Sequence, residues 1–198
     1  MKKVMIAAFL LGHPHNCVSA QYIKKNSTLI KRIDSMFYDD QFWRKEYIKI
    51  NKKEKSEYDS ETIEKKWAIS DSINEVKAKD IINKYGYPGY DLVGEISDNF
   101  WAIVQHCDDD IPFQERVLAL MKVQIAKNNA SKTKYAYLVD RVLINKNEKQ
   151  IYGTQLQRDD KTGKFSPFPL KYPVQTVDKL RKKVGLEPLA DYVKGFDL

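Results

Sequence analysis

The chain has 198 residues, of which 34 are lysine or arginine and 27 are aspartate or glutamate, so its formal net charge is +7. The lysine-rich segment 44–66 also holds six acidic residues, a pattern typical of a solvated mixed-charge surface that argues against nucleic acid as a partner. No segment is apolar over the roughly 20 residues that a transmembrane helix needs, and the length favours one domain.

The first 20 residues have the order of a secretory signal peptide. Two lysines precede an apolar run at 4–11, and Val18 and Ala20 are small enough for the two positions that a signal peptidase reads. We therefore predict that 1–20 is cleaved, that the mature unit is a single helical domain of 21–198, and that the protein is exported, either periplasmic or secreted. An N-terminal helix that packs on the domain is the alternative.

Cleavage would leave His106 and Cys107 as the only histidine and cysteine of the mature chain, with 32 basic residues against 27 acidic ones. A lone cysteine excludes an internal disulfide and every cysteine-based zinc framework. The fold must therefore be held together by an apolar core.

Helices are expected on either side of a polar loop in the first half of the chain, and Phe42, Trp43 and Tyr47 either continue the first of them or start a separate helix. Asn26 can cap a helix whose apolar residues recur at helical spacing over 29–37, and the polar segment 49–58 is expected to be a loop. Asp59 or Ser60 then begins a second helix, which ends at the Gly- and Pro-containing turn 85–89. Its expected apolar side contains Ile63, Trp67, Ile73 and Val76.

Three further helices are expected in the middle of the chain. Ser97 or Asp98 begins the first of them. Pro112 lies in the first turn of the next, 113–127, where its missing N–H costs nothing. Because that helix is apolar on much of its circumference, it is predicted to be the most buried element. Ser131 is expected to cap the third.

The pattern changes towards the C-terminus. Segments 150–157 and 164–168 are expected to be strands joined by a turn at 160–163, and a last helix covers 174–184 before a short turn at 189–193. The predicted fold is therefore mainly α: a single helical domain with a small C-terminal β-hairpin.

His106 lies at the border of the apolar face of its expected helix, where a ring can be oriented by the core and still reach a ligand. Asp108 could act with it as an acid–base pair. A metal site on these two residues is disfavoured because no second histidine is available, so we predict neither a metal nor a cofactor. The alternative is a histidine that binds a neighbouring helix, beside aspartates that only cap the next one.

Asp140 and Arg141 lie off the apolar face of the helix that begins after Ser131. Adjacent helical residues diverge by about 100°, so each needs a partner elsewhere. Arg141 could bind a carboxylate or phosphate group of a ligand. Exposed ion pairs of little energy are the alternative.

Several motifs are distinctive in combination. Gln-His-x-Asp at 105–108 is followed by Phe-Gln at 113–114, Tyr-Leu-x-Asp-Arg-Val at 137–142 and Gln-x-Tyr-Gly-Thr-Gln at 150–155. Together with Asp-Gln-x-x-Arg at 40–44, they make the chain resemble a bacterial domain family of unknown function. This family has no assigned activity, so the resemblance implies sites rather than a reaction.

The resemblance implies that the polar residues of these motifs act together. They either converge on a cleft or form a buried hydrogen-bond network that fixes the fold. The predicted catalytic residues are His106, Asp108, Asp140 and Arg141. The predicted ligand-binding residues are Gln41, Gln105, Gln114, Tyr152, Thr154 and Gln155.

Three functions remain open. In the first, the protein is a hydrolase or lyase for a polar or anionic substrate, with His106 as acid or base, Asp108 or Asp140 orienting it, and Arg141 holding negative charge. In the second, the same pocket binds a sugar, peptide or carboxylate ligand without chemistry. In the third, the motif residues are structural and the surface binds a partner of the cell envelope. The oligomeric state is open.

Overall fold

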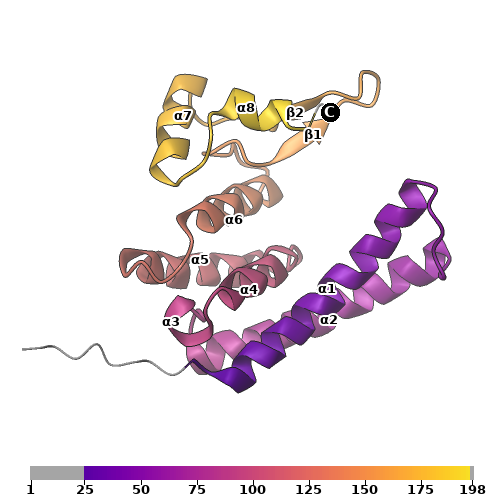
Figure 1. Cartoon of the computed structure of the whole chain (residues 1–198). Coiled ribbons are helices and arrows are strands. Elements are labelled where there is room, and N and C mark those ends of the chain that lie inside the picture. The colour runs from indigo at the N-terminus through magenta and orange to yellow at the C-terminus, as the bar shows by residue number, and fades with distance from the viewer. Residues whose placement is uncertain (1–24, 197–198) are drawn as a thin grey trace, which may run out of the picture.

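The computed structural model describes residues 25–196 (Figure 1). Over that range, eight helices and a two-stranded antiparallel sheet follow one another, which confirms the mainly α fold with a C-terminal β-hairpin. The predicted signal peptide at 1–20 lies outside the described residues. In the part of the chain that is described, no helix has both the length and the apolar character needed to cross a membrane.

Helices α1 (Ser27–Asn51) and α2 (Ser60–Tyr85) form a long antiparallel hairpin that projects from the other helices (Figure 1). Both begin where the sequence predicts, because Asn26 and Asp59 each accept a hydrogen bond from a backbone N–H three residues later. The buried Asn74 side chain of α2 donates to a backbone carbonyl of α1 at 3.0 Å. This contact fixes the register of the two helices.

The central element of the remaining body is α4 (Ile96–Gln105), not the helix that the sequence predicts. Six of its ten residues are buried, against four of sixteen in α5 (Ile111–Ala126). The apolar circumference of α5 is misleading because part of it faces solvent, where Val123 is 53% exposed. Helix α4 packs against α1, α2, α5, the short α3 (Tyr90–Val93) and α6 (Lys132–Asn145).

The apolar side expected for α2 is only partly buried. Ile63 is fully buried, but Ile73 and Val76 are 48% and 61% exposed, and Trp67 lines a cleft. Helix α2 packs mainly against α1 and α4. Its remaining surface therefore faces outward or into the cleft.

The C-terminal part consists of β1 (Leu156–Arg158), β2 (Phe165–Pro167), α7 (Val174–Lys183) and α8 (Leu189–Lys194). The strands pair antiparallel over three residues each. The first strand is shorter than the predicted segment 150–157 because N–H groups in the first half of that segment bind a buried carboxylate instead of a neighbouring strand.

Candidate functional site

A cleft of about 720 Å³ separates the α1–α2 hairpin from the loop that follows α4 and from α6. The hairpin contributes two aromatic side chains, Tyr47 and Trp67, whose ring centroids lie 5.4 Å apart. The opposite wall carries three of the four predicted catalytic residues: His106, Asp108 and Arg141. Chain segments that are distant in sequence therefore meet at one surface.

His106 ends α4 as its C-cap residue, and its side chain is 15% exposed at the cleft. Ring atom Nδ1 lies 2.8 Å from carboxylate oxygen Oδ1 of Asp40, on α1. An ionised carboxylate can only accept a hydrogen bond, so Nδ1 carries the proton of the neutral ring and Nε2 keeps its lone pair. The Gln105 amide nitrogen, 3.4 Å from Nε2, is a weak donor to it. The free ring nitrogen is thus on the side turned away from Asp40.

Asp40 is 1% exposed and is held by two side chains of its own helix, α1. Gln41 donates to Oδ2 at 2.7 Å, and Arg44, one turn further along α1, donates to Oδ1 at 2.9 Å. Arg44 also makes two hydrogen bonds to Asp71 of α2, at 3.0 and 2.9 Å, and stacks over the Trp67 ring. The Trp67 indole in turn donates to Asp71 at 2.8 Å. This network fixes the carboxylate that orients His106.

Asp108 pairs with Arg141 instead of with His106. The Arg141 guanidinium donates to both carboxylate oxygens, at 2.8 and 2.5 Å, and Asn145, one turn along α6, donates at 2.8 Å. Burial raises the pKa of the Asp108 carboxyl, but the hydrogen bonds and charge of Arg141, together with Asn145, outweigh this effect and hold the pKa below its ordinary value. Asp108 is therefore an ionised partner of Arg141.

Asp140 points away from the cleft and into the C-terminal part. Its carboxylate is fully buried and accepts hydrogen bonds from the backbone N–H groups of Ile151, Tyr152 and Thr154 and from the Thr154 hydroxyl, at 2.8 to 3.1 Å. The carboxylate thus organises a loop that lies outside the two strands. This is the arrangement of a structural network.

Arg181 of α7 binds the same loop from the other side. Its guanidinium is fully buried, donates to the backbone carbonyls of Tyr152 and Glu187 at 2.8 and 2.6 Å, and lies over the Tyr192 ring. Tyr152 therefore donates a hydrogen bond to Asp140 with its N–H and accepts one from Arg181 with its carbonyl. Two buried charges of opposite sign are linked through the backbone between them.

The predicted ligand-binding residues divide between these two regions. Gln41 and Gln105 lie beside Asp40 and His106, as described above. Gln114 is fully buried, and its side-chain nitrogen lies within 3.5 Å of two carbonyls at the end of α4 and of Asp108. The other three, Tyr152, Thr154 and Gln155, belong to the loop that Asp140 organises.

The residue that orients His106 is neither Asp108 nor Asp140, the two partners that the sequence analysis considers. It is Asp40, which is 66 positions from His106 in the chain. The Asp-Gln-x-x-Arg motif at 40–44 is the sequence signal for it, since residues four apart share one helix face. No spacing in the chain indicates that this face meets the end of α4.

Cys107 belongs to the core. The thiol is buried against the Ile103 carbonyl at 3.5 Å, and burial raises the pKa of the thiol. Among residues 25–196, no three histidine, cysteine, aspartate or glutamate side chains are grouped so that they could hold a metal ion.

Comparison with curated proteins and with solved structures finds no match. A family model matches residues 29–197, which include every residue that lines the cleft and the whole C-terminal loop network. The resemblance to an uncharacterised domain family is thereby confirmed. The chain belongs to the family described as "Family of unknown function (DUF6624)".

Proposed function

We propose that the protein is a hydrolase or lyase in which Nε2 of His106 takes up and returns a proton at the cleft. The observation that carries this proposal is the 2.8 Å contact between His106 Nδ1 and the buried Asp40 carboxylate. A histidine whose second nitrogen is fixed by a carboxylate has one defined tautomer and a fixed ring orientation, which general acid–base catalysis requires. Asp40 is in this scheme the positioning residue.

The proton transfer has a simple balance. Nε2 removes a proton from water or from a substrate group, and the imidazolium that forms is stabilised by the Asp40 carboxylate. The same Nε2 then returns the proton to the leaving group. The 15% exposure of the ring is compatible with a role in which His106 is oriented by protein yet open to the cleft.

The charges of the cleft favour a polar or cationic substrate over the anionic one that the sequence analysis includes. Arg141 is paired with Asp108, and Arg44 is paired with both Asp40 and Asp71. Neither guanidinium is therefore free to bind an added anion without breaking an existing pair. Further carboxylates line the cleft at Glu64, Glu75 and Asp109.

A binding module without chemistry is the second candidate, and one observation favours it. The Tyr47 and Trp67 rings form an aromatic pair on the cleft wall. Such rings bind sugars and cationic groups through their faces without any titrating residue.

The test compares wild type, His106→Asn and Asp40→Asn on neutral, cationic and anionic esters, amides, glycosides and phosphoesters, with product formation as the readout. Asp34→Asn is the matched control, because Asp34 is an exposed aspartate of α1. We expect turnover of a neutral or cationic compound that His106→Asn lowers by about 10²- to 10⁴-fold and that Asp34→Asn leaves unchanged. Turnover that survives in His106→Asn contradicts the acid–base role.

Binding measurements separate the two candidates. If a compound binds wild type and His106→Asn with equal affinity and neither protein converts any compound of the panel, the protein is a binding module. If binding is equal and only wild type converts the compound, the acid–base proposal holds.

We propose in addition that the domain acts outside the cytoplasm, in the periplasm or as a secreted protein. The support is the order of charged, apolar and small residues over 1–20. Mass spectrometry of the protein recovered from its producing cells should give an N-terminus at Gln21. Recovery of a chain that still begins at Met1 would contradict the proposal.

A further inference from the structure

The outward side of α2 carries a stripe of exposed aliphatic side chains. Ile69, Ile73 and Val76 are 45%, 48% and 61% exposed. Their i, i+4, i+7 spacing places them on one helix face. That face is separate from the cleft, because the cleft is lined by other α2 residues, among them Ala68 and Ser72. A stripe of this kind on a helix that is otherwise rich in charge is typical of a surface that is covered by a protein partner.

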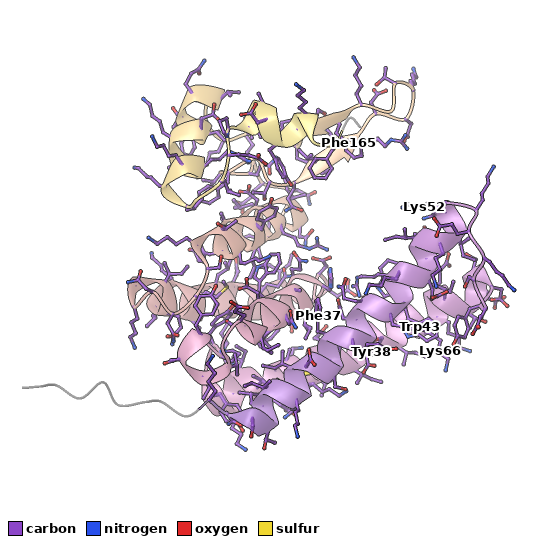
Figure 2. All side chains as sticks on the ribbon, viewed as in Figure 1. Phe37, Tyr38, Trp43, Lys52, Lys66 and Phe165 are labelled. Carbon is purple, nitrogen blue, oxygen red and sulfur yellow. The ribbon has the colours of Figure 1, made fainter. Side chains whose placement is uncertain are left out.

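A groove of about 210 Å³ runs beside this stripe, between α1 and α2. Trp43 of α1 contributes an aromatic wall, and in Figure 2 it lies close to Lys66 on the projecting hairpin. We call the stripe and the groove together the outer face. Its members are Asp39, Trp43, Lys66, Ile69, Ile73, Val76 and Lys77.

The charges of the outer face have opposite signs on the two helices. Asp39 belongs to α1, whereas Lys66 and Lys77 belong to α2. Within residues 25–196, none of these three side chains forms an ion pair. Three unpaired charges therefore lie on the α1 side of the exposed stripe, with the negative charge on one wall of the groove and the positive charges on the other.

The register of the hairpin places Asp39 between the two lysines. Asn74 contacts Met36, and Asp71 contacts Arg44. Asp39 lies between those two levels of α1, so along the helix axis it falls between Lys66 and Lys77. A lysine side chain on an opposing helix could reach it from either direction.

We propose that the outer face binds a second copy of this chain. A two-fold axis parallel to the hairpin places α1 of each copy over α2 of the other, in antiparallel orientation. Asp39 of each copy then lies opposite the two lysines of its partner, on both sides of the axis, while each aliphatic stripe packs against α1 of the other copy. The result is a four-helix arrangement that leaves both clefts open.

The first test measures self-association of the purified protein by sedimentation velocity over a wide concentration range. We expect a monomer–dimer equilibrium in which Ile73→Lys raises the dimer dissociation constant by roughly 100-fold or more, since each dimer buries two copies of the substituted side chain. Val123→Lys is the matched control, because Val123 is an equally exposed aliphatic residue on α5. Circular dichroism verifies that both variants are folded.

The second test inverts the charges. Asp39→Lys alone places three positive groups on each outer face and should weaken association. Adding Lys66→Asp and Lys77→Asp in the same chain inverts every sign, restores the complementarity and should return the dissociation constant to near the wild-type value. This recovery is the result expected for a contact between copies of the same face.

Three results overturn the proposal. The first is a wild-type protein that stays monomeric at every concentration. The second is equal weakening by Ile73→Lys and Val123→Lys, which would place the interface elsewhere. The third is an inverted-charge variant that associates no better than Asp39→Lys.

Discussion

The Asp40 carboxylate and the His106 ring, which belong to helices α1 and α4, are joined by a 2.8 Å hydrogen bond at the edge of a charged cleft. The contact exists only when the hairpin is docked on the body, since the two residues lie 66 positions apart. It defines which ring nitrogen is left to accept a further hydrogen bond, and it depends on Arg44, which holds the carboxylate from its own helix. The site is therefore a product of tertiary packing.

Asp40→Asn should lower turnover without abolishing it. The amide that replaces the carboxylate can still contact Nδ1, but it carries no charge to stabilise the imidazolium and can favour the wrong tautomer. We expect a fall in kcat of about 10²-fold or more with KM changed little. Steady-state kinetics on the substrate found with wild type checks this. A variant with full kcat would remove Asp40 from the mechanism.

Asp140→Asn should destabilise the protein through the C-terminal loop. The substitution replaces one acceptor oxygen by an NH₂ group that faces backbone donors, so N–H groups of Tyr152 or Thr154 lose their buried partner. The expected loss of unfolding free energy is about 2–4 kcal/mol, measured by urea unfolding. Asp160→Asn, at an exposed position of the turn between β1 and β2, is the control. Equal stability of both variants would contradict the structural role.

Arg181→Met should have a comparable effect from the opposite side of the loop. Methionine keeps part of the apolar length but leaves the carbonyls of Tyr152 and Glu187 without their donor. We expect a loss of about 2–4 kcal/mol and a lower melting temperature in calorimetry. The exposed Arg158→Met gives the baseline for removing an arginine. Equal melting temperatures for Arg181→Met and Arg158→Met would contradict the structural role of Arg181.

The Asp108–Arg141 pair predicts one component of the pH dependence of stability. Because the pKa of Asp108 is lower in the folded state than in the unfolded state, its contribution is complete above the ordinary carboxyl pKa of about 3.9 and is lost as the pH falls through the folded value. The side chain is 39% exposed, so screening limits the contribution to about 1 kcal/mol or less.

Urea unfolding of wild type and Asp108→Asn measures this component. The difference in unfolding free energy should be largest near neutral pH and should shrink towards about pH 3. A difference that stays constant with pH would mean that the ionised carboxylate contributes nothing beyond its shape.

The sequence predicts the helices well because their start signals are local. Asn26, Asp59, Asp110 and Ser131 each accept a backbone hydrogen bond at the position where capping chemistry places a helix start. The C-terminal β-hairpin is predicted less well. Segment 150–155 has the alternation of a strand, but the buried carboxylate of α6 binds its N–H groups, and no local rule reveals such a partner.

The candidate site is predicted only in part, because the sequence shows the position of a residue on its helix but not the partner that the residue meets. His106 is identifiable from its border position on a helix, and the charged pair at 140–141 from its place off the apolar face. The direction in which each charged side chain points is set by tertiary packing. Asp140 points into the C-terminal part, whereas Arg141 contacts Asp108 in the loop after α4. Which carboxylate faces His106 is likewise decided by the docking of α1.

The central claim is that the Asp40 carboxylate accepts a hydrogen bond from the Nδ1–H of His106, so that the lone pair of the neutral ring lies on Nε2. Nitrogen-15 NMR of the imidazole ring reports the tautomer directly, with His106→Asn identifying the signals. The account predicts that the neutral ring is the Nδ1–H tautomer in wild type and that Asp40→Asn alters this preference. A neutral wild-type ring that carries its proton on Nε2 would contradict it.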